Sequence, residues 1–541
     1  MARLRWRAEF LMLANIIRNA KKTTGPIEPT VWTLTVQTTA INQAFGMNIQ
    51  NGTTYSVTID WGDGSSPQVF TTSGIKTVTY AAIGTYTVLI TGTGSCNMAV
   101  ATTNPSRVIA TSAIPRTLAA GGAGCFSSTF LNCTSLTTIP ENLFWYSATP
   151  LTTNAFPSTF RGCTGLTNIP VDLFRYNTGV TTTAFQQTFS GCTGLTSIPT
   201  GLFQYNTGMT SSAFSSTFSG CTGLTSIPTG FFQYNTGVTT VAFQGTFSGC
   251  TGLTNIPTGL FQYNTGVTTT AFSQTFRACT GLTSIPSDLF LYNTGVTSGA
   301  FGNTFQSCTG LTSLPVDLFR YNTGVTSQAF IATFQSCTGL TSLPSDLFRY
   351  NTGVTTSAFQ QTFSGCTGLT SIPTGLFQYN TGMTSSAFLQ SFIGCTGLTS
   401  IPAGLFQHNT GVTSQAFYAT FQNCTGLTSI PVDLFRYNTG MTTTAFSLTF
   451  SGCTGLNGYA VQADLLRYNT LMSGTSTASN MFSGVTLNTV AYSNLLISLN
   501  TYLTASSLGF GGGSSKYDSS ATTARAALVA RSWSIVDGGA A

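Results

Sequence analysis

The chain has 541 residues, of which 57 are Gly, 41 are Phe and only 6% are charged, against roughly 25% in an average soluble domain. No apolar run approaches the roughly 20 residues that span a bilayer, and so many aromatic residues exclude a chain that stays unfolded throughout. Positions 1–22 hold most of the net charge of +6, so the remainder lacks the cation clusters that bind nucleic acid, and no nucleic-acid partner is expected. The exterior is instead neutral and rich in Thr and Ser, which is common on secreted and virion-surface proteins.

Residues 1–26 are predicted to form an amphipathic docking helix followed by a linker. Four apolar residues recur at spacings of four, three and four positions, which places them on one face of a helix. The residues expected to dock the protein on other virion or surface-assembly proteins are Arg3, Arg5, Trp6, Arg7, Phe10, Leu13 and Ile17. A poor signal peptide, or a helix that caps the next domain, remains an alternative.

Residues 27–94 are predicted to form a small β-domain. Segments 32–36, 55–59 and 85–90 alternate apolar with polar residues, as half-buried strands do. A turn, Asp60-Trp-Gly-Asp-Gly64, lies between these segments, and Tyr80 is followed by Gly84-Thr-Tyr-Thr-Val88.

These two segments resemble the signature of PKD domains, which are immunoglobulin-like β-sandwiches. The family's aromatic residue between Trp61 and Gly62 is missing here. The resemblance covers about 65 residues and implies a spacer or adhesion module of an extracellular protein. Asp60 and Asp63 fit either a calcium site or a tight turn whose carboxylates bond its own amides, and we prefer the turn.

A repeat with a period of 29 residues dominates residues 133–458. Its clearest marker is a cysteine in the same place of every unit: Cys163, Cys192, Cys221, Cys250, Cys279, Cys308, Cys337, Cys366, Cys395, Cys424 and Cys453. Cys133 precedes this series by 30 residues. A strict period over more than 300 residues predicts a solenoid of about 12 coils.

Within a unit, the apolar residues predict short elements. Phe185, Phe189 and Cys192 are spaced as one face of a short helix. Leu195-Thr-Ser-Ile198 stops at a proline and is predicted to be a strand of a parallel ladder, whereas Tyr205-Asn-Thr-Gly208 is expected to turn the chain back. Since no unit can enclose its own apolar residues, each must stack over its copy at about 4.8 Å, which builds aromatic ladders inside.

The repeat resembles the leucine-rich repeats of BspA-like surface proteins. The shared pattern is Ala184-Phe185, then Phe189, then Cys192-Thr-Gly-Leu-Thr-Ser-Ile-Pro199. The period is longer than usual for that family, and the Leu-Phe-Gln/Arg-Tyr-Asn-Thr-Gly segment is extra. The resemblance implies a mixed α/β fold, a right-handed leucine-rich-repeat solenoid preceded by the PKD-like sandwich, with an adhesive surface rather than an active site.

The solenoid is expected to be capped at both ends. Residues 95–132 are predicted to be a transition and an N-terminal cap, and residues 459–541 a C-terminal capping segment. In the latter, helices are expected over 492–503 and 517–528, around a loop at 509–513. The ending, Trp533-Ser-Ile-Val-Asp-Gly-Gly539, is similar to the closing segment of many bacterial and phage repeat proteins.

The residues that usually carry chemistry are scarce. The cysteine column lacks the paired ligands of a zinc site, and packing of reduced thiols is preferred to disulfides. His408 is the one histidine, which excludes a Ser-His-Asp triad and comparable arrangements elsewhere. Four aspartates of the array have an arginine three residues later: Asp172 and Arg175, Asp317 and Arg320, Asp346 and Arg349, Asp433 and Arg436. We therefore expect surface ion pairs, no enzyme activity, no cofactor and no metal.

Positions that vary between units are the candidates for ligand contact. They follow each Ala-Phe pair and each second Phe, and amide or hydroxyl side chains there suit a host cell-surface glycan or an uncharged protein. The candidates are Gln186, Gln187, Gln274, Gln306, Gln335, Gln360, Gln361, Tyr418 and Gln422. An unconstrained, solvated surface is the alternative.

Together these features predict a non-enzymatic, receptor-binding structural protein of a phage virion, of the tail or head fibre type. No convincing secretion signal accompanies the extracellular-looking domains, which favours assembly into a particle inside the cell. A secreted bacterial BspA-like adhesin at the cell surface is the alternative, and a glycan depolymerase is a third hypothesis.

Overall fold

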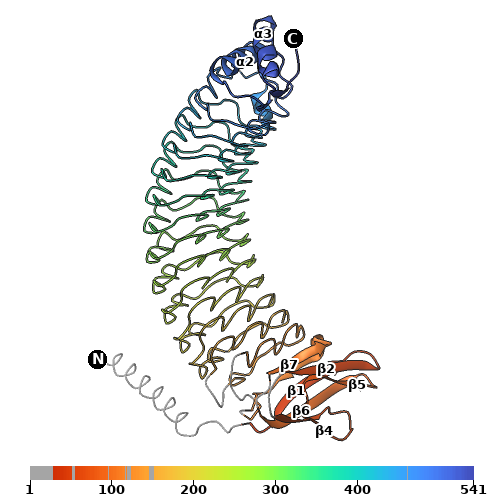
Figure 1. The fold of residues 1–541 in the computed structure, drawn as a ribbon. Helices are drawn as coiled ribbons and strands as arrows, with labels where there is room; N and C mark the ends of the chain where they lie inside the picture. Colours follow the sequence, from red (N-terminus) through yellow and green to blue (C-terminus); the bar gives the residue numbers. More distant parts are fainter. Residues whose placement is uncertain are drawn as a thin grey trace, which may run out of the picture.

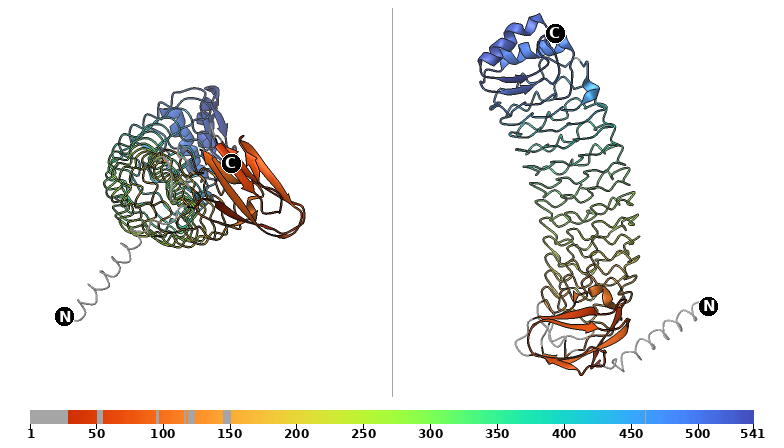
Figure 2. Two further views of the ribbon diagram at one scale, coloured as in Figure 1. Left: turned by 90° about the horizontal axis from the view of Figure 1, so that it is seen from below. Right: turned by 90° about the vertical axis from the view of Figure 1, so that its right-hand side faces the viewer.

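The computed structural model describes residues 29–50, 55–94, 97–115, 117–118, 124–144, 151–459 and 461–541. It shows a β-sandwich at one end, a long curved stack of coils, and a small helical cap at the other end (Figure 1). Viewed along its axis, the stack superimposes coil upon coil (Figure 2). No helix within the described part of the chain is both long and apolar enough to cross a bilayer.

The sandwich consists of eight strands in two sheets, with the orders β4-β3-β6-β1-β8 and β5-β2-β7. The strands are β1 Trp32–Thr38, β2 Gln43–Gln50, β3 Tyr55–Asp60, β4 Gln68–Phe70, β5 Gly74–Tyr80, β6 Gly84–Gly94, β7 Asn97–Thr103 and β8 Val108–Thr111, with the 3-10 turn η1 at Pro105–Arg107 before β8. Alternate residues of β1 and β3 are buried, as expected for half-buried strands. The strands β7 and β8 lie beyond residue 94, in the segment expected to be a transition.

The Asp-Gly turn after β3 is held by its own carboxylates. Asp60 accepts a hydrogen bond from the Gly62 amide at 2.9 Å, and Asp63 accepts one from the Ser65 amide at 3.0 Å. The hydroxyl of Ser65 donates a second hydrogen bond to Asp63. Both bonds lower the pKa of the Asp63 carboxyl, and the bond from the hydroxyl has the larger effect. Both acids are thereby engaged in the turn, which is the geometry preferred from the sequence over a calcium site.

The sandwich covers the first coil and shares its core. The β7 residue Val100 donates its amide hydrogen to the carbonyl of Thr129 at 2.7 Å, and Ile114 donates to Leu143 at 3.0 Å. The ring of Trp32 packs edge-on against Phe130, with 6.1 Å between ring centroids. These contacts close the N-terminal end of the stack.

Each coil contains a run of tight turns, here called the turn run (residues 183–191 and their equivalents in the other coils). Every fourth residue is left-handed, with φ of 53° at Thr183, 57° at Gln187 and 74° at Gly191. The backbone amides alternate in their partners along the run. The amides at positions 185, 187, 189 and 191 donate to carbonyls of the next coil at 2.7–3.0 Å. The amides at positions 186, 188 and 190 donate to the carbonyl three residues earlier in the same coil, at 3.1–3.2 Å.

The helix predicted for this segment is therefore wrong, since the described part of the array has turns in its place. The strand predicted over 195–198 is also absent, because the segment is extended without a continuous ladder. Its neighbour-coil bonds are few and long, such as Thr225 N to Thr196 O at 3.4 Å. A left-handed non-glycine residue costs about 1–2 kcal/mol, and the hydrogen bonds to the next coil offset that strain.

Three columns of phenylalanine fill the interior of the stack. Successive rings of the Phe189 column lie parallel, with 5.4–5.8 Å between centroids. In the Phe174 column the corresponding distances are 5.9–6.4 Å. The rings of the Phe189 column thus lie closer together than those of the Phe174 column, and the stack as a whole is curved (Figure 1).

The C-terminal cap continues the stacking and then ends it. Its elements are η2 Thr454–Leu456, α2 Thr489–Tyr502, β9 Gly509–Gly511, η3 Ser519–Ala521, α3 Thr522–Ala530 and β10 Ser534–Val536. The last coil bonds to β9 through Ala478, whose amide donates to Gly509 at 3.1 Å, and β9 pairs in parallel with β10. A strand thus occupies part of the loop predicted at 509–513, and it covers backbone groups of the last coil that would otherwise lack partners.

A buried ion pair locks the cap. Arg525 binds Asp537 through two parallel bonds of 2.9 and 3.0 Å, and the Tyr492 hydroxyl donates to the same carboxylate at 3.0 Å. Asp537 belongs to the Trp-x-Ile-x-Asp-Gly-Gly ending singled out in the sequence. The ending therefore has a structural role here, which is to tie α3 and the chain end to α2.

One column of glycines lies where the backbones of neighbouring coils approach so closely that a side chain would clash. A Cβ atom at Gly310 would lie 2.6 Å from the Thr280 carbonyl oxygen and 2.8 Å from that of Leu282. We expect Gly310→Ala to lower the free energy of unfolding by about 1–3 kcal/mol, because neighbouring backbone must move apart. Urea denaturation should show a smaller loss for the control Gly324→Ala, whose Cβ would be 3.2 Å from its nearest neighbour, and equal losses would contradict this explanation.

Candidate binding surface

The predicted docking residues of the N-terminal segment, Arg3 to Ile17, lie outside the described residues. Their role stays a prediction. The described part of the chain therefore offers the coil surfaces, the sandwich and the cap as places to search for a site.

The nine predicted ligand-facing residues all lie on the turn run of their coils. They are half-buried rather than fully exposed. Several bond across coils, as Arg277 does to Gln306 at 2.7 Å and Gln361 to Gln390 at 2.8 Å. Since these side chains partly satisfy one another, the turn run is a self-bonded surface, and its availability to a ligand is lower than the sequence indicated.

The cysteines of the column, Cys163 to Cys453, are all buried. Each thiol of the column donates to a phenylalanine carbonyl of the preceding coil, for example Cys192 Sγ to Phe160 O at 3.2 Å. Burial raises the pKa of the Cys192 and Cys366 thiols to about 12. Thiols of this kind pack as small apolar groups and are poor nucleophiles.

These raised pKa values predict a loss of stability in alkali. In the unfolded chain a thiol ionises near its ordinary pKa of 9.0, whereas the folded chain keeps it protonated, so the stabilisation present below pH 9 is lost as the pH rises. Each thiol is expected to contribute about 1.4 kcal/mol per pH unit above 9. In urea titrations from pH 7 to 10.5, Cys366→Ala should show a shallower decline than the wild type, and identical slopes would contradict the prediction.

The aspartates of the array are paired or bonded to backbone, whereas Glu141 is exposed. Asp172 lies 3.3 Å from Arg175, and the other three predicted pairs are 3.4 Å apart. A fifth pair, Asp464 with Arg467, has the same spacing. Asp288 has no such arginine, and its Oδ2 accepts the Gly259 amide at 2.9 Å. Exposed pairs of this kind contribute little to stability, but they leave few carboxylates unengaged.

Sequence analysis missed a column of buried asparagines. Asn206 donates from Nδ2 to the carbonyls of Phe174 at 3.2 Å and Asn177 at 2.9 Å, and the same pattern recurs along the stack. The members are Asn177, Asn206, Asn235, Asn264, Asn293, Asn322, Asn351, Asn380, Asn409, Asn438 and Asn469. Each amide thus joins two successive coils in the interior. The sequence signal was the invariant Asn of the Tyr-Asn-Thr-Gly segment, which was interpreted only as a turn.

Sequence analysis also missed a column of tyrosines on the outside, here called the tyrosine column. Each tyrosine directly precedes a buried asparagine, so it points away from the interior. The members are Tyr176, Tyr205, Tyr234, Tyr263, Tyr292, Tyr321, Tyr350, Tyr379, Tyr437 and Tyr468, with His408 in one place. His408 is exposed, and its Nε2 lies 3.0 Å from the Gln407 amide. Aromatic side chains exposed in series are typical of contact surfaces.

The residue before each tyrosine determines whether another side chain covers the tyrosine ring. In five coils it is an arginine, which lies over the tyrosine of its own coil. In four of these it also lies over the tyrosine of the next coil, as Arg349 does over Tyr350 at 5.7 Å and Tyr379 at 5.2 Å, whereas Arg467 lies over Tyr502 of α2. In other coils it is a glutamine, whose amide folds back over a glycine of its own coil. A Cβ atom at Gly230 would meet the Gln233 amide carbon at 3.1 Å.

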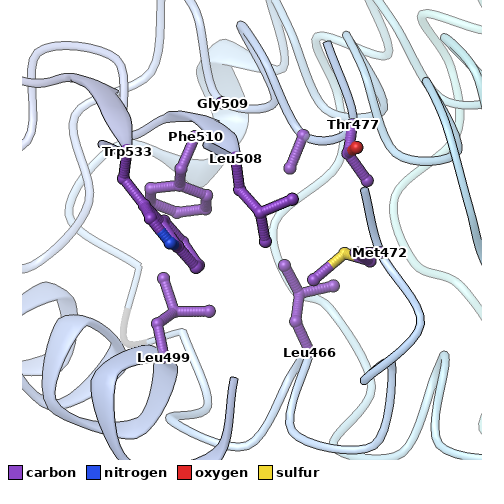
Figure 3. A pocket seen from close by; sticks show the side chains of 9 residues that line it. Leu466, Met472, Thr477, Leu499, Leu508, Gly509, Phe510 and Trp533 are labelled. Carbon is purple, nitrogen blue, oxygen red and sulfur yellow. The ribbon is translucent and has the colours of Figure 1, made fainter. Parts of the chain in front are cut away.

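Two small cavities lie at the ends of the stack. One lies between the last coil and the cap, lined by Leu466, Met472, Leu499, Phe510 and Trp533 among others (Figure 3). Its free space is about 10 Å³, which suffices for one water molecule. Ligand pockets are typically hundreds of Å³, so these cavities are packing defects rather than binding sites.

Among the described residues, no group of three or more His, Cys, Asp or Glu side chains converges as metal ligands would. The tyrosine column is therefore the candidate binding surface that the geometry favours most. No protein-family model matches the chain, and no curated protein matches it either.

Proposed function

We propose that the protein is a non-enzymatic adhesive component of a phage virion, of the tail or head fibre type. The stack of coils would present a neutral surface to a receptor on the host, and the N-terminal segment would dock on the particle. The proposal includes the two family resemblances, a leucine-rich-repeat solenoid of the BspA-like type and a PKD-like sandwich.

One observation carries the adhesive part of the proposal. Most coils of the described stack present an exposed tyrosine, while most of the array's carboxylates are paired and its column of thiols is buried. A surface of this kind can hold a long partner at many weak contacts, whose combined strength exceeds that of any single one.

Two features support the virion part. The basic, amphipathic pattern of residues 1–26 suits attachment to a larger assembly, and the closing motif at Asp537 is of a type found on phage and bacterial repeat proteins. Both rest on the sequence, so they need a direct test.

Mass spectrometry of purified phage particles tests the location. The proposal predicts that the protein is present in the particles with an N-terminal peptide that begins at Met1 or Ala2. A mature chain that begins near residue 30 and is recovered from the bacterial cell surface would contradict it and would favour the secreted adhesin.

Binding to cells tests the adhesive role. Fluorescently labelled full-length protein is expected to label the surface of host bacteria, and unlabelled protein should displace it. A protein that labels no strain of a host panel, or that shortens purified host glycans, would contradict the proposed function.

A further inference from the structure

We propose that Tyr234, Tyr263 and Tyr292, here called the open tyrosine run, bind an uncharged polysaccharide whose sugar rings stack on the tyrosine faces. This inference rests on the proposed adhesive function and names the ligand class and the coils that hold it.

The open tyrosine run is the part of the tyrosine column that arginine leaves uncovered. The residues that precede the three tyrosines in their own coils are Gln233, Gln262 and Leu291, and Gln204 precedes them by one coil. No guanidinium of the described chain stacks on these three rings, whereas arginines lie over the tyrosines of the coils on either side, such as Tyr205 and Tyr321.

A tyrosine that lies under an arginine of the preceding coil is less exposed: Tyr205 is 38% and Tyr379 39% exposed, against 47–48% for the three tyrosines of the open run. An arginine of the tyrosine's own coil has little effect on exposure, since Tyr176 is 51% and Tyr437 46% exposed. The side-chain amides of Gln233 and Gln262 lie close to Gly230 and Gly259 of their own coils. Three adjacent coils thus present tyrosine rings that no guanidinium of the described chain covers.

The charge around the run selects the class of ligand. From residue 176 to residue 316 the charged residues are Arg277 and Asp288. Arg277 lies on the turn run, bonded to Gln306, and Asp288 accepts the Gly259 amide at 2.9 Å. A nucleic acid or an acidic polysaccharide would need several cations to replace its counterions, and a strongly charged peptide would find at most one partner charge. The surface therefore favours an uncharged ligand.

The chemistry of the surface fits sugar rings. The faces of tyrosine rings offer an apolar platform with a polar hydroxyl at the edge, which suits the C–H face and hydroxyl rim of a pyranose. Exposed threonines follow each ring two positions later, at Thr236, Thr265 and Thr294, and supply further hydrogen-bonding groups. Because the coils repeat, a polymer can lie along the column and contact each ring in turn.

Affinity electrophoresis of the full-length protein tests the inference. The gels contain dextran, yeast mannan or hydroxyethylcellulose as uncharged polysaccharides, and alginate as a polyanion. We expect at least one uncharged polysaccharide to retard the protein, alginate not to retard it, and Y234S/Y263S to bind at least tenfold more weakly. Retardation by alginate alone, retardation by none of the uncharged polysaccharides, or unchanged binding by Y234S/Y263S would overturn the inference.

A second variant keeps the tyrosines and covers two of their rings with an arginine side chain. Gln233→Arg introduces the residue that five other coils already hold at this place, so it should fold, and its guanidinium is expected over Tyr234 and Tyr263. We expect several-fold weaker binding for this variant and less than a twofold change for Ser219→Arg, which adds the same charge on the turn run, at the place where Arg161 and Arg277 stand in their coils. Equal effects of the two substitutions would overturn the inference.

Labelling of host cells separates this inference from the proposed function. If Y234S/Y263S labels host cells as strongly as the wild type, the open tyrosine run is not the binding site, although the adhesive function stands. If the wild-type protein labels no cells, the proposed function itself fails. Loss of labelling in Y234S/Y263S and Gln233→Arg, with labelling retained in Ser219→Arg, supports both.

Discussion

Replacing Phe305 by alanine is expected to lower the free energy of unfolding by about 3–5 kcal/mol, the range for a large aromatic side chain removed from a core. The ring is fully buried and stacks between those of Phe276 and Phe334, with centroids 5.8 and 5.7 Å away. Its removal leaves a cavity that neighbouring coils cannot close, since backbone hydrogen bonds fix their spacing. Urea denaturation followed by circular dichroism measures the loss.

A nearby exposed position supplies the control for Phe305. Thr309→Ala changes a side chain on the surface of the same coil, and we expect its effect to stay within about 0.5 kcal/mol. A loss below about 1 kcal/mol for Phe305→Ala would contradict the ladder of stacked rings as a main source of stability.

Replacing Asn322 by alanine is expected to cost about 2–5 kcal/mol. Its Nδ2 donates to the carbonyls of Phe290 at 3.1 Å and Asn293 at 3.0 Å, and each buried carbonyl that loses its donor costs about 1–3 kcal/mol. The same urea titrations measure this loss, with Thr323→Ala as the exposed neighbour for comparison.

The isosteric variant Asn322→Asp separates hydrogen bonding from volume. It keeps the shape of the side chain but turns an oxygen toward the two carbonyls, so we expect it to be at least as destabilising as Asn322→Ala. Acidification should lessen the loss, because a protonated carboxyl can donate one hydrogen bond. A variant as stable as the wild type at neutral pH would show that the asparagine column does not hold the coils together.

The sequence predicted the repeat and its interior well, because both follow from composition and period. Residues that recur every 29 positions, such as Phe189 and Cys192, are buried in every described coil. The local structure of the turn run could not be predicted, because a spacing of four and three residues fits a helix as well as a run of turns with a left-handed residue at every fourth position. Thr183 and Gln187 are ordinary helix residues, and only the bonds to the next coil make them left-handed.

The candidate surface was harder to predict than the core. For the four Asp and Arg pairs of the array, the sequence predicts only ion pairs on the surface. The structure adds that Arg349 lies over two tyrosines while Gln233 folds back over Gly230. Which tyrosines are covered depends on contacts between successive coils, and the sequence of one unit does not show these contacts.

Small-angle X-ray scattering of the full-length protein tests the central claim, that the repeats stack into one continuous rod between the sandwich and the cap. A compact globule of this length would have a radius of gyration of about 24 Å, whereas twelve coils at about 4.8 Å or more already span roughly 60 Å before both ends are added. We predict a radius of gyration well above 30 Å and the cross-section of a single rod, roughly constant along its length. A value near that of the globule, or scattering from separate folded beads on a flexible chain, would contradict the account.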